Sequence, residues 1–119
     1  MGDEHERLLR ALYDAFNRRD IEAVLPALAP DVDWPNAWEG GRVHGREAVR
    51  EYWTRQFAAI AGQVEPQRFS VTDGGRVAVT VHQVVHSLDG DLLADQVVTH
   101  VYAFRDGLVE RMDVIEPEG

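Results

Sequence analysis

The hydrophobic pattern of this 119-residue chain changes its period once, and no other feature limits the fold as strongly. Up to Gly62, apolar side chains recur every three or four positions, as they do on amphipathic helices. From Gln67 onward they recur at every second position, which is typical of half-buried strands. Asp-Gly pairs at 89–90 and 106–107, and the triplet 73–75, separate the strand segments and favour hairpin turns. Helices followed by an antiparallel meander predict an α+β domain whose helices cover one face of a curved sheet.

Three helices are expected before the strands. The first begins with a capping-box pattern formed by Asp3 and Glu6. Its apolar stripe contains Leu8, Leu9, Leu12, Tyr13 and Phe16. A shorter helix begins after Asp20, and a third runs from residue 46 to a C-terminal cap at Gly62. The segment between these two predicts a short strand from about residue 32, followed by a loop.

Composition limits the kinds of partner. Hydrophobic residues make up 45% of the chain and charged residues 28%, which is ordinary for one globular domain spanning residues 1–119. The net charge of −9 repels nucleic-acid phosphates and anionic membrane surfaces, so neither is an expected partner. The sequence contains no cysteine, which excludes disulfides and thiolate metal sites. The sequence also lacks a signal-peptide pattern and a membrane-length apolar run, so we expect a cytoplasmic protein. It has no phosphate-binding loop, and His82 and His86 lie too far apart on one strand to share a metal ion, so we expect no cofactor or metal.

The turn at Asp89-Gly90 also predicts which side chains share a face. If these residues are the centre of a two-residue turn, Val79 lies opposite His100 on the next strand. Because side chains alternate along strands, one face then collects Val77, Val79, Val81, Gln83, Val85, Gln96, Val98, His100, Tyr102 and Phe104. This more apolar face should meet the helices, joined by Met112 from the last strand. A three-residue turn would instead shift the pairing by one position on one strand.

His100 is the strongest candidate for chemistry on that face. Burial among valines can move the pKa of an imidazole across neutrality, which suits acid–base catalysis. The alternative is a core histidine that only hydrogen-bonds a neighbour such as Tyr102 or Gln83. Gln83 and Gln96 pair across the same hairpin, and their amides could bind a polar ligand or could satisfy each other.

The stretch LAPDVDWPNAWEG supplies further candidates. Alternation along a strand directs Trp34 and Asn36 toward a cavity and Asp33 away from it. A bulge at Pro35 would instead turn Asp33 inward, where its carboxylate could act as a base. Residues 38–39 form either a lid over the cavity or an exposed loop.

Several aromatic residues lie at helical spacing on the first and third predicted helices. Such residues most often belong to a core, but the same types line cavities that accept flat apolar molecules. The residues predicted to contact a ligand are Tyr13, Trp34, Trp53, Phe57, Gln83, Gln96, Tyr102 and Met112.

Three segments, LYDAFNRRDIEAVLPALAPDVDW, GREAVREYW and HVYAFRDGLVERMDV, carry a resemblance to a known superfamily. With them the chain resembles the nuclear transport factor 2-like superfamily, in its SnoaL-like and ketosteroid isomerase-like branch. The resemblance implies a conical pocket between helices and sheet, and a homodimer formed through the convex face of the sheet. That face would otherwise expose Val84, Val97, Val101 and Ile115. It also implies a small apolar or aromatic ligand, because the superfamily includes isomerases, polyketide cyclases, dehydratases and binding domains.

The catalytic residues of the isomerases do not carry over. Their general base falls on Asn36, whose amide cannot abstract a proton, and their oxyanion-hole tyrosine falls on Leu12, one residue before Tyr13. Their second oxyanion donor, a protonated carboxylic acid, falls on His100. We therefore predict an isomerase, cyclase or hydratase with His100 as acid or base, and with Asn36, Gln83 and Tyr13 orienting the substrate. The alternative is a ligand-binding or dimerisation module that uses the same cavity without turnover.

Overall fold

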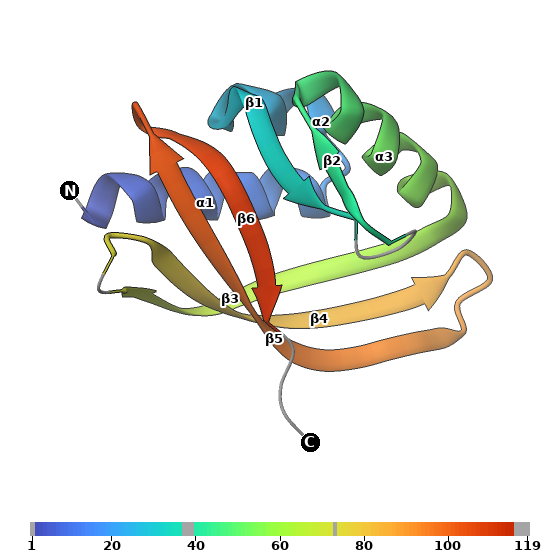
Figure 1. Ribbon diagram of the computed structural model, residues 1–119. Coiled ribbons are helices and arrows are strands. Elements are labelled where there is room, and N and C mark those ends of the chain that lie inside the picture. Colours follow the sequence, from blue (N-terminus) through green and yellow to red (C-terminus); the bar gives the residue numbers. More distant parts are fainter. Residues whose placement is uncertain (1, 37–39, 73, 116–119) are drawn as a thin grey trace.

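Three α-helices pack on a six-stranded sheet in the described part of the chain, which comprises residues 2–36, 40–72 and 74–115 of a computed structural model (Figure 1). The helices are α1 (Gly2–Asn17), α2 (Ile21–Val24) and α3 (Arg46–Ala59), with a 3-10 turn, η1 (Leu25–Ala27), after α2. The strands are β1 (Leu28–Pro35), β2 (Arg42–His44), β3 (Ile60–Val71), β4 (Val77–Ser87), β5 (Leu92–Arg105) and β6 (Leu108–Ile115). Their order in the sheet is β2-β1-β6-β5-β4-β3. The predicted α+β class, with helices on a curved sheet, is confirmed. None of the helices within the described residues is both long enough and apolar enough to cross a membrane.

Helix α1 turns one apolar stripe toward the sheet and keeps its other side in solvent. Leu9 and Leu12 are buried, whereas Arg10 forms an ion pair on the exposed side. At the end of the helix, the Asn17 side chain donates to Val64 O at 2.7 Å and accepts from Val64 N at 2.9 Å. The Asn17 amide thus bonds backbone groups that a neighbouring strand would otherwise pair with, because β3 lies at the edge of the sheet. These bonds hold α1 on the sheet and block part of that edge.

Several elements differ from the sequence-based expectation. Strand β3 begins at Ile60, whose extended backbone directly follows α3, so Gly62 lies inside a strand and does not cap the helix. Pairing of β3 with β4 as far as Ser87 supplies the hydrogen bonds that favour the earlier start. Strand β2 occupies part of the expected loop, and β1 runs parallel to β6, which makes the sheet mixed. The capping side chain of Asp3 and the turn residue Asp73 lie outside what the structure describes.

The β4–β5 hairpin has the predicted pairing but not the predicted turn. Val79 lies opposite His100, as expected. The turn, however, has three residues, with Gly90 N donating to Ser87 O at 3.0 Å and Gly90 adopting a φ of +97° that favours glycine. Alone, this turn would shift the pairing by one position. A bulge that leaves Leu93 without a partner in the ladder restores it.

Figure 1 shows that the sheet bends along β5. Strands β3 and β4 and the start of β5 pass beneath α3, while the end of β5 rises beside β6 toward β1 and β2. The concave side carries a layer of valines that are at most 3% exposed: Val77, Val79, Val81 and Val98. Burial of each such side chain stabilises the fold by about 1.5–3 kcal/mol, so this layer holds the helices against the sheet.

Candidate functional site

A cavity of about 190 Å³ lies between the concave face of the sheet and helices α1 and α3. Its described lining residues are Leu12, Tyr13, Phe16, Trp34, Pro35, Tyr52, Trp53, Gln56, Val64, Gln83, Gln96, Val98, His100, Tyr102, Met112 and Val114. Aromatic and aliphatic side chains predominate, and the polar groups are one imidazole, three phenols, three amides and two indole N–H groups. This composition suits a small and largely apolar molecule that is oriented by a few hydrogen bonds.

Two tyrosines and a histidine form a hydrogen-bonded chain at the buried end of the cavity. The Tyr102 hydroxyl donates to the Tyr13 hydroxyl at 2.8 Å, and the Tyr13 hydroxyl lies 2.8 Å from Nδ1 of His100. Tyr102, Tyr13 and His100 are 0%, 3% and 7% exposed. Strand β5 presents two of the three residues because positions two apart share a face, and α1 brings the third. The side chain that bonds His100 is therefore Tyr13, not Tyr102 or Gln83, the partners that the sequence suggested.

Burial sets the protonation of this chain. Desolvation lowers the pKa of His100 from 6.5 to about 4, so its imidazole is neutral at pH 7. Burial likewise raises the pKa of Tyr13 and of Tyr102, so both phenols keep their protons. Because Tyr102 donates to Tyr13, the proton of Tyr13 is available for the Nδ1 lone pair of His100. We therefore assign His100 the tautomer that carries its proton on Nε2. No described residue accepts a hydrogen bond from this Nε2–H group.

Gln83 and Gln96 lie opposite each other on the concave face, farther toward the hairpin turn than His100. Both line the cavity, and Gln83 is half-buried whereas Gln96 is exposed, so the pair marks the open end. The two side chains do not hydrogen-bond each other or any other residue that the structure describes. Their amides are thus available to a ligand, and the mutual bond that the sequence left open is not formed.

Trp34, Trp53 and Met112 form apolar walls. The two indoles meet edge to face with ring centroids 5.4 Å apart, and Met112 is buried on β6. Phe57, which was predicted with them, is not among the described lining residues. Its ring packs on Phe16 at 5.1 Å, and Phe16 lines the cavity in its place. Phe57 therefore supports the wall from behind.

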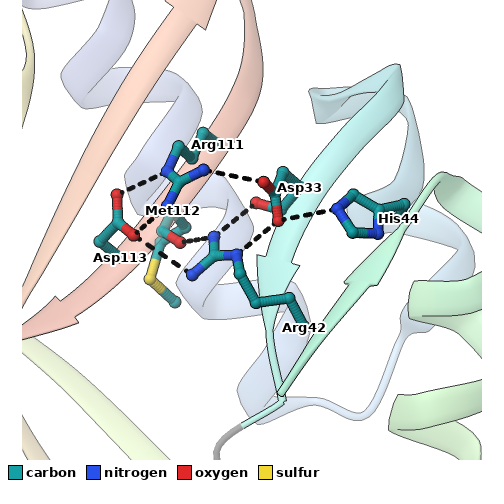
Figure 2. Close-up of polar contacts among 6 residues, drawn as sticks. All are labelled: Asp33, Arg42, His44, Arg111, Met112 and Asp113. Carbon is teal, nitrogen blue, oxygen red and sulfur yellow. Dashed lines mark hydrogen bonds and ion pairs between the residues drawn. The ribbon is translucent and has the colours of Figure 1, made fainter.

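Asp33 lies away from the cavity, in an ion-pair network between β1, β2 and β6 (Figure 2). Its carboxylate accepts from Arg42 Nε at 2.5 Å and from Arg111 Nη1 at 2.8 Å, and it lies 3.5 Å from Nε2 of His44. The Arg42 hydrogen bond holds the pKa of Asp33 below its usual range. The structure thus places Asp33 where simple alternation along the strand directs it, not turned inward by a bulge. An ionised carboxylate paired with two guanidinium groups is poorly suited to act as a base.

The same network joins two strands that form part of the cavity wall. Arg42 Nη2 donates to Met112 O at 2.6 Å and to Asp33 O at 3.2 Å, bridging β6 and β1 at the end of the irregular stretch of their parallel pairing. Arg111 and Asp113 form a further ion pair at 2.9 Å, which extends the network (Figure 2). The cavity faces of β1 and β6 are therefore held from the opposite side of the sheet.

Asn36 is buried but is not among the described lining residues. It follows β1, and its backbone begins the turn toward β2, with Asn36 N donating to Gly41 O at 2.9 Å. The alternation that directed it into the cavity ends at Pro35, which lines the cavity itself. The lid residues 38–39 lie outside the described part of the chain.

Gln56 is a lining residue that the sequence reasoning missed. It lies three positions after Trp53 on α3, and this helical spacing could have identified it. Its Oε1 is buried and accepts no hydrogen bond within the described structure.

Among the described residues, no three His, Asp or Glu side chains gather in a way that could hold a metal ion. The described lining also contains no Asp, Glu or Arg, so the cavity offers only neutral polar groups.

Comparison with known proteins identifies the family. The model of the SnoaL-like domain family matches residues 9–112. The chain belongs to this family. Among solved structures, the SnoaL-like domain is similar to TerC co-crystallised with polyporic acid (28% identity, TM-score 0.82, 96% of this chain and 92% of TerC covered). It is also similar to an NTF2-like protein of unknown function from Burkholderia pseudomallei (29% identity, TM-score 0.82, 96% of this chain and 91% of that chain covered). A putative polyketide cyclase from Xanthomonas campestris pv. campestris is similar as well (28% identity, TM-score 0.78, 95% of this chain and 90% of that chain covered). No curated protein matches the chain.

Proposed function

We propose that this SnoaL-like domain binds a small apolar or aromatic molecule in its cavity and catalyses its isomerisation, cyclisation or hydration with His100. The observation that carries the proposal is the Tyr102–Tyr13–His100 chain, which leaves a neutral imidazole N–H in an apolar cavity. Two similar proteins support a ligand of this kind, since TerC was crystallised with polyporic acid and another is a putative polyketide cyclase.

His100 acts as a hydrogen-bond donor to the substrate. Because its pKa is about 4, the imidazolium form is scarce at neutral pH, and Nε2–H polarises a substrate carbonyl oxygen without giving up its proton. When the C–H bond beside that carbonyl breaks, the proton passes to water and the electron pair moves to the oxygen. The N–H then stabilises the resulting enolate. Loss of one such donor typically lowers kcat by about 100- to 1000-fold.

Hydrogen–deuterium exchange of 2-tetralone tests this proposal, because this flat ketone has exchangeable protons beside its carbonyl. In D2O, proton NMR should show exchange that the wild-type protein accelerates and that His100→Ala slows about 100-fold. His82→Ala is the matched control, since His82 is paired with Asp95 outside the cavity and should leave the rate unchanged. Equal rates for wild type and His100→Ala would refute the catalytic role.

A binding module without turnover is the second candidate. It is favoured by the described lining of the cavity, which includes no carboxylate to serve as a base. Saturable binding of 2-tetralone with exchange no faster than in buffer would support this candidate.

We also propose that the domain forms a homodimer through the convex face of the sheet. Val97 and Ile115 on that face are 44% and 56% exposed, an unfavourable state for neighbouring apolar side chains in a monomer. Sedimentation equilibrium at micromolar concentration should give twice the chain mass, and a monomer would refute the proposal.

A further inference from the structure

We infer that Gln83 and Gln96 form a second polar subsite, so that the ligand is a flat, rod-like molecule with an oxygen function at each end. One oxygen binds the Nε2–H of His100, and the other binds the paired amides at the open end of the cavity. The inference rests on the proposed function for its first end and extends it to the shape and polarity of the ligand.

The position of the glutamines carries the argument. They face each other directly in the β4–β5 ladder, on the same side of the sheet as His100. Both line the cavity, and neither amide bonds another side chain in the described residues. Between them and His100 on β5 lies Val98, an apolar side chain that lines the cavity. Along β5 the cavity wall therefore has a polar residue at each end and an apolar residue between them.

The strand geometry gives the length of the ligand. Gln96 precedes His100 by four residues on β5, a separation of about 13 Å at about 3.3 Å per residue. A hydrogen bond of about 2.9 Å at each end leaves about 7–13 Å between the two polar atoms of the ligand.

The volume is consistent with a rod that is only partly enclosed. A cavity of about 150 Å³ holds one benzene molecule. The 190 Å³ here therefore encloses about one ring with its substituents, and a second ring extends toward the exposed Gln96.

Biphenyl-4-ol and biphenyl-4,4′-diol form a matched pair of probes, because they differ only in the hydroxyl at the far end. Either end of the symmetric diol can reach His100, which doubles its apparent affinity without a second contact. After division by this factor of two, isothermal titration calorimetry should show that the diol binds the wild-type protein about two- to tenfold more tightly, the effect of one additional hydrogen bond. The double variant Gln83→Leu/Gln96→Leu should lose this advantage and still bind the mono-ol. Gln63→Leu makes the same chemical change on the exposed part of β3, outside the cavity, and should keep the advantage. Thermal unfolding checks that each variant is folded.

The outcomes separate this inference from the proposed function. A diol that binds no better than the mono-ol, or that keeps its advantage in the double variant, overturns the second subsite. His100→Phe should weaken both probes in the same proportion. If it weakens neither while the double variant still abolishes the advantage, the role of His100 fails and the glutamine subsite stands. If neither probe shows saturable binding to the wild type, both proposals are overturned.

Discussion

Replacing Tyr13 by Phe removes the hydroxyl that joins Tyr102 to His100. The substitution keeps the ring and leaves two buried groups without partners: the hydroxyl proton of Tyr102 and the Nδ1 lone pair of His100. Since each unsatisfied buried group costs about 1–3 kcal/mol, we expect the two together to lower the free energy of unfolding by about 2–6 kcal/mol in Tyr13→Phe. The loss should also free the imidazole to protonate on either nitrogen. Urea denaturation measures the first effect, and nitrogen-15 NMR of the imidazole measures the second.

Tyr102→Phe is the matched control, because it removes only the first bond of the chain and leaves the bond between Tyr13 and His100. It should cost about 1 kcal/mol and leave the Nε2–H tautomer in place. Equal losses for the two variants, or an Nδ1–H tautomer in the wild type, would refute the assigned direction of the chain and with it the donor role of His100.

Three further predictions concern the rest of the molecule. Because burial depresses the pKa of His100 to about 4, the unfolded chain binds a proton that the folded chain excludes. Stability should therefore be complete above pH 6.5 and fall by about 3 kcal/mol toward pH 4. Urea denaturation across that range should show a flatter profile for His100→Gln, and an unchanged slope would contradict the burial effect. Arg42→Met, which breaks the link between β1 and β6, should cost about 1–3 kcal/mol in the same assay, whereas Arg105→Met breaks only an exposed pair and should leave the stability nearly unchanged. Comparable losses would show that the network is not structural. Gly90→Ala forces alanine into a positive φ and should cost about 1–2 kcal/mol by thermal unfolding, and a neutral result would mean that the turn adopts another conformation.

The pairing of β4 with β5 was predictable even though its turn was not. The valines of the two strands must share the buried face, and a slip by one position would expose them all. The burial of this face therefore selects the register, and the bulge at Leu93 adjusts the longer turn to it. Asn36 is buried like Val32 and Trp34, as alternation predicts, but it follows the end of β1 and is not among the described lining residues.

The candidate site was predictable as a set of residues and not as an arrangement. The sequence indicated His100, Gln83, Trp34 and Trp53, because a face of a strand or helix can be read from spacing alone. It did not indicate that Tyr13 bonds His100, because these residues are 87 positions apart and the contact depends on how α1 crosses the sheet.

The amino-acid sequence by itself determined the two halves of the fold and the face on which each strand residue lies, because both depend on contacts between positions two to four apart. The tertiary structure decided what those faces meet. It paired Asp33 with arginines from β2 and β6, and it buried His100 within hydrogen-bonding distance of Tyr13, which Tyr102 bonds in turn. Such contacts depend on the angles and distances between packed elements, and those are set only when the whole core is assembled.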